Sequence, residues 1–258
     1  MPLRIAVMTT SPGQGSTTYA VALAWSAAAD RTVRLIDADP AIGTVRTLLD
    51  LDGPASIENV LGSAGVPASA LEAQSVAVGG RPQLRVVPGF HRWEFRSAQV
   101  VGRVAPALVQ LPDDVVIVDI GCPFDPPEGG GPSALSMLAA NFDTILVVVR
   151  AQADLLERAI RVLDGAPLTR ARLVIARPPH RREMAASLDL LREHLPALAG
   201  PLEWDWDPAR VVSQGVTGVP IHRAGMLEET GLVGEGRAVP LNRRGGALGW
   251  FRPHRSEP

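Results

Sequence analysis

Thr9-Thr10-Ser11-Pro12-Gly13-Gln14-Gly15-Ser16-Thr17-Thr18 follows an apolar run at residues 5–8 and precedes an Ala-rich helical pattern at residues 19–29. That order predicts a strand, a glycine loop and the start of a helix. Small residues let successive backbone N–H groups face one anion, and a helix N-terminus adds partial positive charge. The stretch therefore predicts a phosphate-binding loop, whose candidate contacts are Gly13, Gln14, Gly15, Ser16, Thr17 and Thr18.

Two further stretches place carboxylates where apolar runs end. Leu35-Ile36-Asp37-Ala38-Asp39-Pro40 ends one predicted strand, and Val116-Ile117-Val118-Asp119 ends another. Ligands of open α/β sheets bind at the carboxyl edge of the strands. We therefore add Asp37, Asp39 and Asp119 to the candidate binding residues.

Short apolar runs alternate with helical patterns along most of the chain. The runs predict strands at 3–8, 31–36, 84–87, 115–120, 144–149, 173–176 and 202–204. Helical spacing predicts helices at 17–29, 43–49, 56–61, 97–111, 153–164 and 181–195, with Ser56 as a cap and Pro106 as a kink. Residues 62–82 predict a loop. The alternation favours a doubly wound, mostly parallel α/β sheet flanked by helices.

The composition narrows the class of protein. A length of 258 residues fits one domain, which we place at residues 1–234, followed by a Gly-, Arg- and Pro-rich tail at 235–258. The formal net charge of −2 is unlike that of a general nucleic-acid-binding protein. A single cysteine, an N-terminus without a signal-peptide pattern and the lack of an apolar run of roughly 20 residues favour a soluble cytoplasmic protein, at most peripherally attached to a membrane.

The three motifs together resemble the MinD/ParA family of P-loop ATPases, over about residues 3–225. The family's loop reads K-G-G-x-G-K-[ST]-T, and a D-x-D-P segment and a strand ending in aspartate follow it in the same order. The resemblance implies that Thr17 and Asp119 hold the Mg²⁺ of a bound nucleotide, Asp119 through water. It also implies that Asp39 positions the attacking water if the site is active.

The loop departs from the family's pattern where positive charge is needed. Ser11 and Ser16 stand at the two lysine positions, Pro12 replaces a glycine, and all 25 basic residues of the chain are arginines. Ala176 stands where the family has an asparagine that reads adenine. Lysine clamps the charge that develops on a transferring phosphoryl group. We therefore expect a degenerate P-loop, with ATP or ADP and Mg²⁺ bound weakly or not at all, and with no catalytic residue in use.

Within the family the chain is most similar to the CpaE/TadZ branch of pilus assembly. The residues that carry this likeness are those at 39–45 and 86–89, and Asp207-Pro208 followed by Gly218-Val219-Pro220. The resemblance implies a scaffold or localisation factor for a membrane-associated assembly, such as pilus, secretion or division machinery. The implied partners are proteins of that assembly, and a second copy or a related ATPase in a dimer, without specific nucleic acid.

The tail adds a candidate membrane contact. Residues 237–258 carry five arginines and one glutamate, and they include Ala247-Leu248-Gly249-Trp250-Phe251. An aromatic pair among arginines suits an anionic lipid surface, so we expect peripheral contact through Trp250 and Phe251. A peptide that binds a protein partner is the alternative for this tail.

Two other functions compete with the scaffold. One is a working MinD/ParA-type ATPase switch that dimerises on ATP, with arginines in place of both lysines. The other is a dinucleotide-dependent oxidoreductase, because Gly13-x-Gly15 followed by Asp37 or Asp39 is similar to a Rossmann fingerprint. In that fingerprint the third glycine corresponds to Thr18 here.

Overall fold

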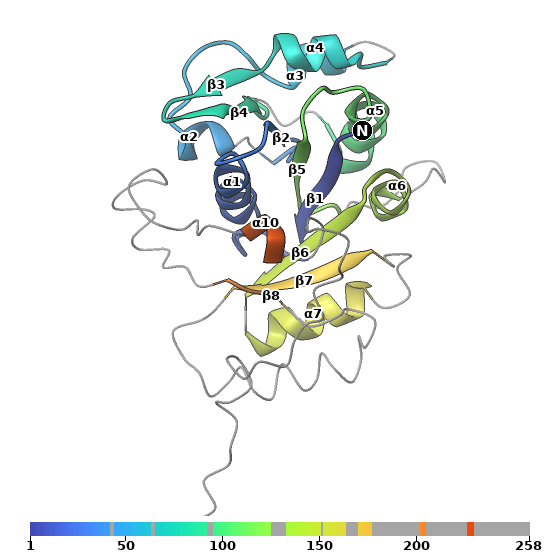
Figure 1. The fold of residues 1–258 in the computed structure, drawn as a ribbon. Helices are drawn as coiled ribbons and strands as arrows, with labels where there is room; N and C mark the ends of the chain where they lie inside the picture. The colour runs from blue at the N-terminus through green and yellow to red at the C-terminus, as the bar shows by residue number, and fades with distance from the viewer. Residues whose placement is uncertain are drawn as a thin grey trace, which may run out of the picture.

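A computed structural model describes residues 1–41, 44–62, 65–91, 95–124, 133–150, 152–163, 170–176, 202–204 and 226–229. Its strands are β1 Leu3–Thr9, β2 Val33–Asp37, β3 Val76–Val78, β4 Arg81–Val87, β5 Val115–Gly121, β6 Thr144–Arg150, β7 Ala171–Ala176 and β8 Leu202–Trp204. They form one eight-stranded sheet in the order β3-β4-β2-β5-β1-β6-β7-β8 (Figure 1). Only β3 runs antiparallel to its neighbour, so the predicted mostly parallel sheet is confirmed.

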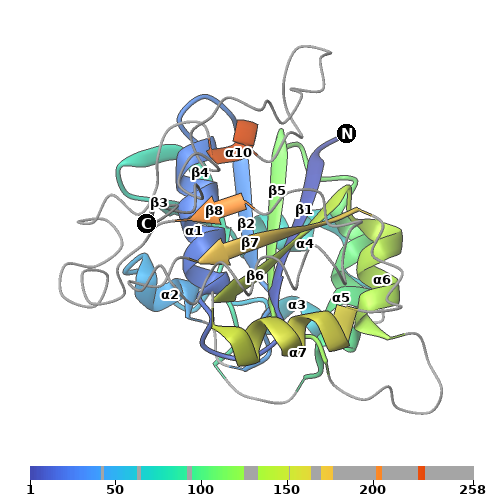
Figure 2. The ribbon, with the colours of Figure 1, turned by 90° about the horizontal axis from the view of Figure 1, so that it is seen from below.

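Helices cover both faces of the sheet. They are α1 Ser16–Ala27, α2 Val45–Leu48, α3 Glu58–Leu61, α4 Ala68–Ala73, α5 Ser97–Leu108, α6 Ala134–Asn141, α7 Ala153–Leu163 and α10 Met226–Glu229. Apolar residues of α1, α2 and α10 pack on one face, and those of α3 to α7 pack on the other. Figure 2 shows α1 and α10 on the opposite side of the strands from α5 and α6.

The two faces explain why the central strands read as unbroken apolar runs. In β5, Val116 and Val118 belong to the core on the α5 face, while Val115 and Ile117 belong to the core on the α1 face. Successive side chains of a strand point to opposite faces, so a strand covered on both sides needs an apolar residue at nearly every position. The exceptions on such strands are therefore candidates for function.

Some predicted elements differ from the structure. Residues 62–82 are not a loop throughout, because they contain α4, β3 and the start of β4. These pieces are too short to show a period. Helix α3 begins at Glu58 with Ile57 at the capping position, although the Ser56 hydroxyl does accept the Glu58 N–H at 3.2 Å. Helix α5 continues through Pro106 and ends at Leu108, before the predicted end.

Other predictions fall outside the described residues. They are the helix at 181–195, the late segment from Asp207 to Pro220, and the tail at 235–258 with Trp250 and Phe251. The domain boundary and the membrane contact therefore stay predictions. Among the helices that the structure describes, none combines the length and apolar character needed to cross a membrane.

Candidate functional site

The candidate site lies at the carboxyl edge of the sheet, where four strands deliver polar residues to one place. The glycine loop follows β1, which is flanked by β5 and β6. Asp37 at the end of β2 is in register with Asp119 near the end of β5, and Asp119 is in register with Val7 of β1. The edge thus holds the loop and the carboxylates side by side, as the spacing predicts.

The loop has the backbone shape that its glycines permit. Gly13 and Gly15 have φ of 78° and 93°, in the left-handed region that side chains with a Cβ rarely adopt. Gly15 is the N-cap of α1, and no side chain caps the helix there. The first N–H groups of a helix have no partner within the helix. The start of α1 therefore presents unpaired donors, with their partial positive charge, to the edge of the sheet.

The serines at the two lysine positions are turned inward. Ser11 is 7% exposed and Ser16 is 6% exposed. The Ser11 N–H is directed to the Thr9 hydroxyl oxygen at 3.4 Å, and that hydroxyl donates to the Ser11 carbonyl oxygen at 3.0 Å. Neither serine brings a cation to the loop. At the start of the loop, Thr9 and Ser11 form hydrogen bonds with each other.

Gln14 ties the loop to the neighbouring strand. Its side chain is buried, and its Oε1 accepts the backbone N–H of Arg150, the last residue of β6, at 3.1 Å. The Nε2 of the same amide is buried and has no hydrogen-bond partner among the described residues. Sequence reasoning placed Gln14 in the loop but missed this contact, because the two residues are far apart in the chain.

Asp37 organises the turn that follows β2. Its carboxylate is fully buried and accepts the N–H of Asp39 at 3.4 Å and the N–H of Val45 at 3.1 Å. Burial raises the pKa of Asp37 well above its usual range, and the charge of Asp119 adds to the rise, against the lowering effect of the Val45 N–H. Asp37 therefore holds the segment that carries Asp39 in place.

Asp39 lies directly against the backbone at the end of β5. A Cβ built on Gly121 would lie within 2.5 Å of Asp39 Cγ and of its two carboxylate oxygens. One of those oxygens, Oδ1, accepts the N–H of Ala41 at 2.9 Å. Gly121, with φ of 66°, is thus a residue that the site requires and that sequence reasoning did not single out.

Asp119 lies beside the first turn of α1. Its Oδ1 accepts the Gly121 N–H at 3.3 Å, while Oδ2 is buried without a hydrogen-bond partner among the described residues. Burial raises the pKa of Asp119 to about 7, with a further rise from Asp39, and the Thr17 hydroxyl and the Gly121 N–H oppose it. Asp119 and Thr17, the two residues predicted to hold Mg²⁺, are therefore neighbours.

We expect the protonation of Asp119 to appear in the pH dependence of the free energy of unfolding. An unfolded aspartate loses its proton near pH 4, whereas the native group keeps it to about pH 7. The native state therefore binds more protons between these values, and the free energy of unfolding falls as pH rises through that window. Asp119→Asn should stabilise the fold at pH 8 by roughly 1–2 kcal/mol, and by less at pH 5.

Urea denaturation of both proteins at the two pH values measures this effect. Asp52→Asn, at an exposed position, is the matched control and should change stability little. If the Asp119→Asn variant is only as stable as the wild type at pH 8, ionisation of the buried Asp119 carboxyl does not lower the free energy of unfolding.

The buried carboxyl groups of the site lack a cation to balance them within the described part of the chain. Among the described residues, no arginine forms an ion pair with Asp37 or Asp119. Nor do any three His, Cys, Asp or Glu side chains in those ranges have the arrangement to hold a metal ion. Ala176, where the family has its adenine-reading asparagine, is 2% exposed at the end of β7. The site offers backbone donors from the loop and carboxylates from β2 and β5.

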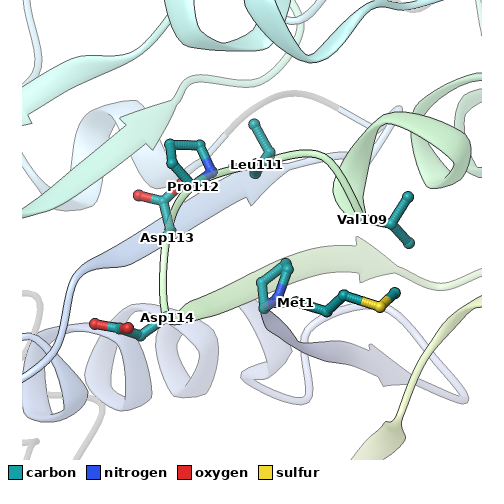
Figure 3. Close-up of a pocket in the computed structure, with 7 residues that line it drawn as sticks. Met1, Val109, Leu111, Pro112, Asp113 and Asp114 are labelled. Carbon is teal, nitrogen blue, oxygen red and sulfur yellow. The ribbon is translucent and has the colours of Figure 1, made fainter.

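A cavity elsewhere on the molecule is distinct from this edge. This cavity has a volume of about 370 Å³, and it is lined by Met1, Pro2, Val109, Leu111, Pro112, Asp113 and Asp114. Figure 3 shows Met1 at the start of β1 and Asp114 at the start of β5. These are the amino ends of the two strands, opposite the glycine loop, so the cavity is not part of the candidate site.

Comparisons with known proteins agree with the arrangement. The sequence matches no family model and no curated protein. The fold is similar to a ParA family ATPase from Chlorobium tepidum TLS (TM-score 0.66, 15% identity, covering 86% of this chain and 92% of that one). It is also similar to MinD in the MinC:MinD cell division complex of Aquifex aeolicus. The TM-score is 0.62 and the identity 18%, over 85% of this chain and 87% of that one. A third similar structure is MinD with Mg-ADP from Pyrococcus horikoshii OT3. Its TM-score is 0.58 and its identity 19%, over 86% of this chain and 88% of that one. The chain therefore has the P-loop ATPase fold of the MinD/ParA proteins.

Proposed function

We propose that the chain is a MinD/ParA-like protein that positions a partner assembly and binds nucleotide weakly, without hydrolysing it. The assembly is membrane-associated, of the pilus, secretion or division kind, and the CpaE/TadZ branch is the relative whose role fits best. Protein partners and a dimer with itself or with a related ATPase belong to this proposal. MinD with MinC in the Aquifex complex is an example of such a pairing on this fold.

One observation carries the proposal: the side chains around the loop are carboxyls and hydroxyls, where hydrolysis needs cations. Phosphoryl transfer depends on groups that stabilise the charge spreading over the transferred phosphate. Ser11 and Ser16 are buried hydroxyl residues, and burial raises the pKa values of Asp37 and Asp119, which form no ion pair within the described part of the chain. A site of this kind supports binding through backbone N–H groups but gives little help to the transition state.

Mg²⁺ fits the residues present in one way. The buried Oδ2 of Asp119 lacks a hydrogen bond within the described part of the chain, and the Thr17 side chain lies next to the carboxylate. A hydrated ion held by these two and by ligand oxygens is therefore accommodated. Such an ion, when bound with a nucleotide, would neutralise part of the phosphate charge. Asp39, held against Gly121, would then bind or orient a water molecule without a lysine to complete the site.

The oxidoreductase alternative does not agree with the order of the strands. A dinucleotide-binding sheet of order 3-2-1-4-5-6 places its first strand next to the second. Here β1 lies between β5 and β6, and β5 separates it from β2. We therefore retain the ATPase switch as the only competing function, and it is the one that the following experiment tests.

We expect the purified protein to show no Mg²⁺-dependent ATP hydrolysis above background, because no lysine is available to stabilise the transferring phosphoryl group. Phosphate release at millimolar Mg-ATP measures it, and Asp39→Ala should give the same background as the wild type. A fluorescent fusion in the native host should form the same discrete foci with either version. A Mg²⁺-dependent rate that disappears in Asp39→Ala, or foci that disperse in that variant, would favour the ATPase switch instead.

A further inference from the structure

Arg150 occupies an unusual place at the edge of the sheet. It is the last residue of β6, and Thr9, the last residue of β1, is in register with Val148. Arg150 therefore lies two residues beyond the paired part of β1, level with the start of the glycine loop. Its own N–H is bound by Gln14 of that loop. The residue is attached to the loop although it comes from another strand.

The side chain of Arg150 belongs to the face on which α1 packs. Leu146 and Val148 lie in the core on that face, while Val147 and Val149 lie in the other. Side chains alternate along a strand, so Arg150 continues the row of Leu146 and Val148. The Asp119 carboxylate, by the same alternation in β5, is on this face too. Arg150 thus projects on the side of the sheet that holds the loop and the start of α1.

The guanidinium of Arg150 is available. Among the described residues it makes no hydrogen bond or ion pair. Arg46 of α2 differs, since it donates to the carbonyl oxygens of Leu51, Gly53 and Ala55. A partly exposed arginine that has no partner among the described residues, beside a helix start that no side chain caps, is a cation placed for an anion.

An independent observation points to a ligand at the same spot. The Gln14 side chain is 1% exposed, and its Nε2 is a donor without an acceptor among the described residues. Because Oε1 of the same planar amide is fixed on the Arg150 N–H, Nε2 is fixed at the junction of the loop and β6. A buried donor without a hydrogen bond costs free energy, so an acceptor is expected there. A phosphate oxygen between loop and Arg150 would supply it.

We propose that Arg150 is the cation of the phosphate site, taking the electrostatic role of the lysines that the loop lacks. The ligand is a diphosphate group, free or carried by a nucleoside, with one phosphate on the N–H groups of the loop and the other on the Arg150 guanidinium. This inference rests on the weak nucleotide site of the proposed function. The guanidinium comes from β6, at the rim of the site. It therefore binds the ligand but does not stabilise the charge that develops on the phosphate in a transition state.

Titration of the full-length protein with pyrophosphate, ADP and AMP at low salt tests the assignment by calorimetry. Pyrophosphate and ADP should bind, and AMP should bind more weakly because it lacks the second phosphate. Arg150→Gln should weaken pyrophosphate and ADP binding about 10- to 100-fold, since it removes a charge-assisted contact. Arg150→Lys should give an intermediate affinity, because it keeps the charge and loses the planar fork. The matched control is Arg158→Gln on the exposed side of α7, which should bind as the wild type does.

A second measurement uses the unmodified protein, so it stands even if Arg150→Gln does not fold. Phenylglyoxal modifies accessible arginines, and peptide mass spectrometry follows each of them. Pyrophosphate should slow the modification of Arg150 and leave that of Arg158 unchanged. Equal rates at Arg150 with and without pyrophosphate would overturn the assignment. So would a wild type that binds neither pyrophosphate nor ADP, or an Arg150→Gln variant that binds both as tightly as the wild type.

The two proposals fail in different ways. Absent diphosphate binding overturns the role of Arg150 and the weak nucleotide binding of the proposed function, but it leaves a scaffold that does not hydrolyse ATP. Hydrolysis of Mg-ATP that depends on Asp39 overturns the scaffold proposal, and it leaves the contact between Arg150 and the diphosphate to the titration.

Discussion

Gly121→Ala is expected to destabilise the protein by about 2–4 kcal/mol. The φ of Gly121 is 66°, and the new Cβ would lie within 2.5 Å of Cγ and both carboxylate oxygens of Asp39. The left-handed backbone costs roughly 1–2 kcal/mol for a residue with a Cβ. The carboxylate must also leave its place, and with it the hydrogen bond to the Ala41 N–H is lost. Chemical denaturation followed by circular dichroism measures the change.

Two companion variants separate the causes of this loss. Gly80 has φ of 75°, and a Cβ at that position would come no closer than 3.9 Å to its nearest neighbour, the Trp25 ring. Gly80→Ala therefore carries the backbone cost alone. Adding Asp39→Ala to Gly121→Ala removes the group that the new Cβ meets and should recover part of the stability. If Gly121→Ala and Gly80→Ala lose equal amounts, the close approach of Asp39 contributes nothing.

Arg34→Met should destabilise the protein by about 3–5 kcal/mol, the cost of leaving a buried carboxylate without its partner. Arg34 is 3% exposed and its Nε donates to Asp113 Oδ2 at 2.6 Å. A second donor, Nη1, reaches the Ser75 hydroxyl. Asp113 is 8% exposed, so little water reaches its carboxylate to replace the guanidinium. The same denaturation experiment measures the effect.

The matched control for Arg34 is a similar pair nearer to solvent. Arg4 and Asp143 are 2.9 Å apart, with side chains 17% and 33% exposed, so Arg4→Met should cost no more than about 1 kcal/mol. The double variant Arg34→Met with Asp113→Leu should regain most of the loss, because an apolar pair of similar volume needs no charge compensation. A double variant as unstable as Arg34→Met alone would contradict this account.

The loop and the carboxylates were predictable because their positions follow from local order. A strand that ends in Asp37 or Asp119 has to deliver that residue to the carboxyl edge of a parallel sheet, whatever its neighbours are. The glycines mark the loop for the same reason. Whether these residues bind nucleotide stays a prediction, but their meeting at one edge did not require knowledge of the strand order.

What escaped prediction depends on contacts between distant residues. The hydrogen bond from Arg150 to Gln14 joins the end of β6 to the loop after β1, and these segments become neighbours only when β6 pairs with β1. The need for glycine at 121 arises in part from the Asp39 carboxylate, in the turn after β2. The elements α4 and β3 have only six and three residues, too few for a repeating helix or strand pattern to stand out in the sequence. In each case the decisive partner is absent from the surrounding sequence.

The place of β1 in the middle of the sheet has a consequence for how the chain acquires its fold during synthesis. This strand is made first, yet Leu3 pairs with Val115 and Ile5 pairs with Thr144. Its apolar residues gain their first neighbour when β5 has been made, at residue 121 of 258, and their second only after β6 has been made, at residue 150. Such distant pairing makes folding slow, and it leaves the apolar surface of the strand exposed in that interval. The strand that carries the glycine loop is therefore made first, but it gains its second neighbour only after β6 has been made.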